Sequence, residues 1–139
     1  MRKIKIAQIG INRYSHAIEV TNSIARQPEI FEFAGIVSPE NEKETMPHKY
    51  EKVCQLPELT LEQVLSDPTI EAVAIETDEI HLTKYALMAA EKGKHIHIEK
   101  PGGTDLSEFE LLINKMKKTR LSQYDIPFPQ RRQLLYTRK

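Results

Sequence analysis

The segment 10–15, G-I-N-R-Y-S, holds the residues best suited to bind the phosphates of a nucleotide. A strand-like apolar run precedes it and a helical pattern follows it, so free N–H groups and the positive end of a helix dipole would face a ligand there. Only the first glycine of the G-x-G-x-x-G pattern is present. The turn therefore predicts a dinucleotide site, with an ordinary strand-to-helix turn as the alternative. Its predicted contact residues are Gly10, Asn12, Arg13 and Tyr14.

The end of the second strand-like segment, 31–37, is where dinucleotide-binding folds place an acidic residue that holds the adenosine ribose. Ser38 stands at that place and is followed by Pro39 and Glu40. A serine can accommodate a 2′-phosphate, so Ser38 points toward NADP, whereas Glu40 could hold the ribose of NAD. The sequence predicts NAD or NADP as the cofactor and leaves the choice between them open.

The most specific run is G-K-H-I-H-I-E-K-P-G-G at residues 93–103, and it is preceded by I-E-A-V-A-I-E-T at residues 70–77. Together they resemble the Gfo/Idh/MocA family of NAD(P)-dependent oxidoreductases, which carries G-K-H-V-x-x-E-K-P after its fifth strand and I-D-A-V-x-I-x-T-P before it. The resemblance extends over approximately residues 1–118. It implies a Rossmann-like fold and hydride transfer between NAD(P) and a sugar-like or other small hydroxyl substrate.

The resemblance also implies roles for four residues near the end of these motifs. Lys100 would project toward nicotinamide and substrate, where an ammonium group can orient a hydroxyl or polarise a developing carbonyl oxygen. Glu99 and Pro101 would shape this turn beside the cofactor, with Pro101 often cis in relatives, and Thr77 would also lie beside the cofactor. The alternative for Lys100 is a solvent-exposed turn lysine without a catalytic role.

The chain departs from the family pattern at several positions. Asp78 and Glu79 replace the family's Pro and Asn, and two carboxylates beside a pyrophosphate would repel it. The family's second motif continues to a histidine five residues after its threonine. That position is Leu82 in this chain, and His81 lies one residue away. Weakened or lost cofactor binding is therefore the alternative to a working dinucleotide site.

Other reactive side chains carry weaker signals. His95, His97 and Glu99 alternate along one strand and form a possible metal-binding trio, but the family resemblance explains His95 structurally, so no metal is predicted. His16 could contact phosphate at the start of a helix. Cys54 is expected to be a small apolar filler rather than a nucleophile.

The elements that must position these residues alternate along the chain. Strand patterns occupy 3–9, 31–37, 71–75 and 95–98, and helical patterns occupy 17–25, 61–65, 82–90 and 106–116. Segment 42–57 predicts a short helix followed by a short strand near 52–55. Thr60 and either Thr104 or Asp105 are the expected helix N-caps. This order predicts a single α/β domain with a doubly wound, Rossmann-like parallel sheet covered by helices on both faces.

A chain of 139 residues is the size of one ordinary domain. Residues 1–120 are predicted to form the NAD(P)-binding domain, and residues 121–139 an irregular basic tail. Relatives carry a C-terminal substrate domain that this sequence lacks, so we expect a truncated form with little or no activity alone. The alternatives are a non-catalytic dinucleotide-sensing module, or a remnant that acts through protein contacts.

Composition narrows the possible partners. Lys plus Arg equals Asp plus Glu at 20 each, so no strong field favours nucleic acid or an anionic membrane. No apolar stretch approaches the ~18 residues needed to cross a bilayer, and no signal segment precedes the first strand. The sequence predicts a cytoplasmic protein that binds a dinucleotide, with a second copy of itself as a further candidate partner.

Overall fold

The computed structural model describes residues 2–119, and the predicted tail at 121–139 lies outside them. The chain forms a parallel four-stranded sheet in the order β2-β1-β3-β4. The strands are β1 (Ile4–Ile9), β2 (Phe31–Val37), β3 (Ala72–Ile75) and β4 (His95–Ile98). This architecture confirms the predicted α/β class, and each strand lies within a residue of its expected bounds.

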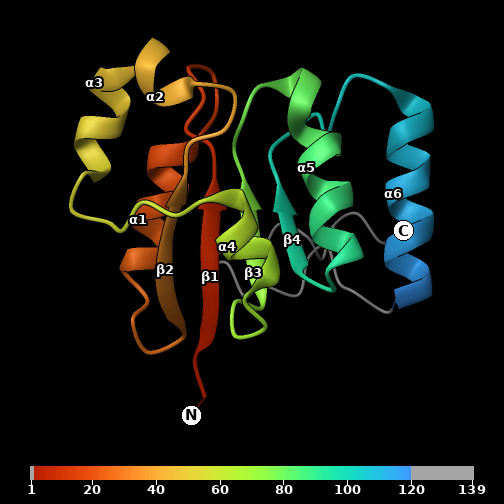
Figure 1. Cartoon of the computed structure of the whole chain (residues 1–139), viewed down its shortest axis with the longest axis horizontal. Coiled ribbons are helices and arrows are strands. Elements are labelled where there is room, and N and C mark those ends of the chain that lie inside the picture. Colours follow the sequence, from red (N-terminus) through yellow and green to blue (C-terminus); the bar gives the residue numbers. More distant parts are fainter. Residues whose placement is uncertain (1, 120–139) are drawn as a thin grey trace, which may run out of the picture.

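Helices cover both faces of the sheet (Figure 1). Helix α1 (Ala17–Ala25) packs on one face, where its Ile24 meets Ile6 and Ala74. Helices α4 (Leu61–Ser66), α5 (Glu79–Glu91) and α6 (Leu106–Thr119) share the core of the opposite face with Ile9 and Ile96. Successive strand residues point to opposite faces, so β1, β2 and β3 contribute to both cores, whereas β4 contributes Ile96 and Ile98 to the second core only. No helix within residues 2–119 is long and apolar enough to cross a membrane.

The predicted strand near 52–55 is wrong. The chain there forms α2 (Glu42–Thr45), α3 (Pro47–Tyr50) and a 3-10 turn (Glu51–Val53), because Pro47 stands at the first position of a helix and presets its backbone angle. The extended segment lies later, at 57–59, and bridges β2 at Ile36. A Cβ on Gly35 would lie 2.4 Å from the Pro57 carbonyl oxygen, so this close approach requires glycine. Because the strand expected near 52–55 is absent, the E-K-P turn follows β4 and not a fifth strand.

The predicted helix caps are present. Thr60 and Gln63 form a reciprocal capping box at α4, with hydrogen bonds of 3.1 and 2.8 Å. Of the two candidates at α6, Asp105 accepts the N–H of Glu108 at 2.9 Å. Because all four strands are parallel, the turns at 10–16, 38–41, 76–78 and 99–103 meet at one edge of the sheet, at the top of Figure 1.

Candidate functional site

Gly10 brings two of these turns into contact. It has φ 91°, and a Cβ there would lie 2.8 Å from the backbone nitrogen and 2.9 Å from the Cα of Thr77. The turn after β1 and the turn after β3 can therefore touch only where the side chain is absent. Dinucleotide folds use their first glycine for a tight turn of this kind. The tight turn expected at Gly10 is present, and its contact with a cofactor stays a prediction.

In the turn between β1 and α1, some backbone N–H groups are hydrogen-bonded within the protein and others are not. Asn12 is buried; its N–H donates to the Glu76 carbonyl, and its side-chain oxygen accepts the N–H of Tyr14 at 2.9 Å. Its side chain thus braces the turn instead of pointing outward. Among the described residues, no acceptor is recorded for the N–H groups of Arg13 and Ser15. These two N–H groups, just ahead of α1, can receive an anionic ligand.

Glu42, at the start of α2, lies at the same edge of the sheet and was not singled out by the sequence. Its carboxylate is buried and accepts hydrogen bonds from the Ile11 N–H at 2.8 Å, the Thr77 hydroxyl at 2.6 Å and the Tyr50 hydroxyl at 3.2 Å. Burial raises the pKa of Glu42 although all three donors oppose the shift. Thr77, predicted to lie beside a cofactor, is 2% exposed and its hydroxyl is engaged by Glu42.

Local backbone geometry explains why Glu42 turns inward. Glu40 and Asn41 both have left-handed angles, with φ 53° and 55°. This reversal after β2 directs the first residue of α2 back toward the sheet. The sequence E-N-E-K-E at 40–44 looks like a solvated charged run, and nothing in it distinguishes the buried carboxylate from its exposed neighbours.

Of the two residues expected near the adenosine ribose, Ser38 stays at the end of β2 and Glu40 turns away to α5. The Ser38 hydroxyl lies at the end of β2 and accepts the N–H of Lys43 at 3.0 Å. The Glu40 carboxylate turns to α5 instead, where Lys84 and the Tyr85 hydroxyl each bind it at 2.6 Å. These two hydrogen bonds lower the pKa of Glu40 to about 2. Glu40 is therefore an ionised partner of α5.

The turn after β4 contains the predicted E-K-P segment, and the Lys100–Pro101 peptide bond is cis. The Glu99 carboxylate accepts the His16 N–H at 3.0 Å, the His16 ring at 2.9 Å and the Lys100 N–H at 2.8 Å. Burial alone would raise the pKa of Glu99, but these donors together lower it to about 2. Glu99 thus joins the turn after β4 to the start of α1, and both the N–H and the ring of His16 bind the Glu99 carboxylate.

The Lys100 side chain is 77% exposed, and its ammonium nitrogen lies 3.8 Å from the Glu99 carboxylate. This placement at the open edge of the sheet agrees with both sequence alternatives, a substrate-facing lysine and a solvated turn lysine. Arg13 and Tyr14 also lie at the surface, with Tyr14 81% exposed. The three side chains are accessible to a ligand.

Glu76 is a second residue that the sequence did not single out. It directly follows β3, its side chain is 0% exposed, and neither carboxylate oxygen has a hydrogen bond among the described residues. The His97 ring nitrogen Nε2 lies 3.4 Å from one of the oxygens. Burial raises the pKa of Glu76, and the neighbouring imidazole offsets this only in part. The apolar run A-V-A-I that leads into Glu76 was the available signal of its burial.

The possible metal-binding trio and the residues at the start of α5 are the remaining candidates from the sequence. Within residues 2–119, no three side chains are arranged to hold a metal ion, and His97 instead approaches Glu76. Asp78 and Glu79 are exposed at the start of α5, and Leu82, at the family's histidine position, is fully buried.

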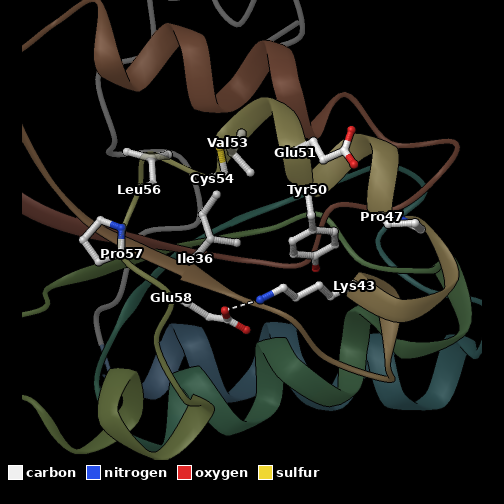
Figure 2. Close-up of a pocket in the computed structure, with 10 residues that line it drawn as sticks. All are labelled: Ile36, Lys43, Pro47, Tyr50, Glu51, Val53, Cys54, Leu56, Pro57 and Glu58. Atoms are coloured by element: carbon white, nitrogen blue, oxygen red, sulfur yellow. Dashed lines mark hydrogen bonds and ion pairs between the residues drawn. The ribbon is translucent and has the colours of Figure 1, made fainter.

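A separate pocket of about 400 Å³ lies beside β2 and is drawn in Figure 2. Its walls are mainly apolar, and a Lys43–Glu58 ion pair of 2.5 Å closes one side. Cys54 lines this pocket and is exposed, so its expected role as a core filler is wrong. The ring of Tyr50 lines the same pocket while its hydroxyl reaches Glu42, which links the pocket wall to the turn after β1.

Comparison with known proteins relates this chain to oxidoreductases. A family model described as "Oxidoreductase family, NAD-binding Rossmann fold", that of Gfo/Idh/MocA proteins, matches residues 4–123. An uncharacterised oxidoreductase of Rhizobium meliloti is 40% identical over 58 residues, which are 42% of this chain and 17% of that protein.

Solved structures share the fold. An oxidoreductase from Erwinia carotovora superposes with a TM-score of 0.71 at 20% identity, over 86% of this chain and 35% of that one. A protein from Desulfitobacterium hafniense, described as an NADPH-dependent oxidoreductase, gives a TM-score of 0.70 at 21% identity, over 87% and 34%. This chain therefore spans about a third of the length of these solved proteins.

Proposed function

Because the chain belongs to the Gfo/Idh/MocA family of oxidoreductases, matched over its NAD-binding Rossmann fold, we propose that it binds NAD or NADP across the turns that follow the four strands. The observation that carries this proposal is the turn before α1. There the N–H groups of Arg13 and Ser15 have no recorded acceptor, and Gly10 allows the close approach of two turns. These features fit the pyrophosphate of a dinucleotide.

NADP is the preferred form of the cofactor in this proposal. The position that holds an acidic residue in NAD-specific sites is Ser38, and the nearby Glu40 is paired with Lys84 and Tyr85 on α5. No unpaired carboxylate of Glu40 is left at the end of β2 to repel a 2′-phosphate.

The proposed chemistry is the oxidation of a small hydroxyl-bearing substrate to a carbonyl compound, in which hydride would pass to NAD(P)+ and the hydroxyl proton to solvent, or the reverse reduction. The bound nicotinamide would accept or donate the hydride. The Lys100 ammonium would stabilise the negative charge that develops on the substrate oxygen, and Glu99, bound to His16, would hold the turn that carries Lys100. Because the Lys100 side chain is 77% exposed to water, we expect little turnover from the 139-residue chain assayed by itself.

Parallel titrations with NADH and NADPH, followed by cofactor fluorescence and by melting temperature, test the proposal. We expect saturable binding of both, tighter for NADPH. Ser38→Asp should reverse this order by about tenfold or more, because a carboxylate repels the 2′-phosphate and accepts the ribose hydroxyls of NADH. Ser66→Asp, at the end of α4, is the matched control and should leave the order unchanged.

Each outcome of these titrations has a distinct meaning. Absence of binding for both nucleotides at millimolar concentration would refute the proposed function. Saturable binding of either nucleotide would support the proposed function, and turnover of a hydroxyl-bearing substrate by the same samples would argue against the sensing alternative. A proposed homodimer can be checked on the same samples by light scattering.

A further inference from the structure

Glu42 lies where three segments frame the proposed phosphate site. Its carboxylate joins the turn after β1 through the Ile11 N–H, the turn after β3 through the Thr77 hydroxyl, and α3 through the Tyr50 hydroxyl. The Ile11 N–H is two residues from the N–H of Arg13, which we assign to the pyrophosphate. A buried side-chain anion therefore already binds the turn that a dinucleotide must approach.

The charged groups around Glu42 do little to neutralise it. Asp78, from the turn after β3, adds a second negative charge and raises the pKa of Glu42 further. Lys49, from α3, lies near enough to interact with Glu42, but its ammonium group binds the carbonyl oxygens of Asn12 and, at 2.8 Å, Arg13. The hydroxyls of Tyr50 and Thr77 are neutral donors. No cation forms an ion pair with the Glu42 carboxylate within residues 2–119.

A pyrophosphate bound at this turn carries two further negative charges close to the same carboxylate. In a buried environment such like charges repel strongly, and protonation of one group is the usual way the repulsion is relieved. The geometry accommodates this proton. A protonated Oε1 can donate to the Thr77 oxygen 2.6 Å away, while Oε2 continues to accept the Ile11 N–H at 2.8 Å.

We propose that Glu42 takes up a proton when the dinucleotide binds, so that cofactor affinity is linked to pH through this one residue. The proton comes from the solvent and stays on Glu42 while the cofactor is bound. This inference rests on the proposed function, because it concerns the same phosphate site. Burial, which already raises the pKa of Glu42 in the free protein, lowers the cost of protonation near neutral pH.

Isothermal titration calorimetry of the full chain with NADH tests the inference, because the pyrophosphate does not titrate near neutral pH. Runs in two buffers of different ionisation enthalpy measure the protons taken up. We expect uptake approaching one proton per NADH above the pKa of free Glu42, with a dissociation constant that rises up to about tenfold per pH unit. Glu42→Gln should abolish the uptake and flatten the pH profile. Glu44→Gln, on the exposed side of α2, is the matched control.

Tyr50→Phe gives a second test that keeps the carboxylate. The Tyr50 hydroxyl lowers the pKa of Glu42, so its removal should move the onset of the affinity loss to higher pH. NADH binding without proton uptake, or uptake that persists in Glu42→Gln, would overturn the inference and leave the proposed function intact. If neither wild type nor Glu42→Gln bound NADH or NADPH at any pH, both would be overturned.

Discussion

Two buried carboxylates, Glu42 and Glu76, lie at the same edge of the sheet in opposite surroundings. Glu42 accepts hydrogen bonds from one N–H and two hydroxyls, whereas neither oxygen of Glu76 has one among the described residues. Their exposed fractions, 4% and 0%, are nearly the same. Burial raises the pKa of both acids, so burial alone does not distinguish them, and the donors that face each carboxylate decide how much its removal costs the fold.

The contrast separates the two halves of the site. On the β2 side, Glu42 binds three segments together, and its removal would leave their donors unsatisfied. On the β4 side, burial raises the pKa of Glu76, and the His97 ring nitrogen Nε2 lies 3.4 Å from its carboxylate. A single pair of substitutions with opposite expected signs can test this interpretation.

The largest effect should come from Glu42→Ala. Loss of the carboxylate leaves the buried donors of Ile11, Thr77 and Tyr50 without their acceptor, so we expect a loss of about 3 kcal/mol in the free energy of unfolding. Urea unfolding at pH 7 measures it. Glu44→Ala, at an exposed position on the same helix, should change stability by less than about 0.5 kcal/mol. Equal effects of the two variants would show that the hydrogen bonds of Glu42 contribute nothing.

Glu76→Gln should have the opposite sign. The pKa of Glu76 is raised on folding, so its contribution to stability is fully present below the ordinary value of 4.5 and is lost as pH rises through the folded pKa. The neutral amide has no charge to bury, so we expect the variant to be about 1–2 kcal/mol more stable than wild type at pH 8. The two proteins should converge below pH 4. Urea unfolding between pH 4 and pH 8 checks this, and a variant less stable at pH 8 would contradict it.

The sequence predicts the strands well because each is a short apolar or β-branched run, such as A-V-A-I at 72–75. It also predicts the N-cap at Thr60 from a local motif, and the family resemblance implies the cis bond before Pro101. In segment 42–57 the predicted short helix is present, but the strand predicted near 52–55 is wrong, because two prolines interrupt any period. Glu42 and Glu76 were missed for a different reason. Each lies beside other acidic residues, and which one turns inward depends on contacts with segments distant in sequence.

Glu99 tests whether the donors or the location set the sign of the effect, because it lies on the Glu76 side of the site but has the donors that Glu76 lacks. Hydrogen bonds from His16 and Lys100 overcome the effect of burial and hold the pKa of Glu99 at about 2. Its stabilising contribution is therefore present above pH 4.5 and is lost as pH falls toward 2. We expect Glu99→Gln to cost about 1 kcal/mol at pH 7 and almost nothing at pH 2, measured by urea unfolding. A stabilising effect at pH 7 would mean that the β4 side of the site, and not the donor count, determines the sign.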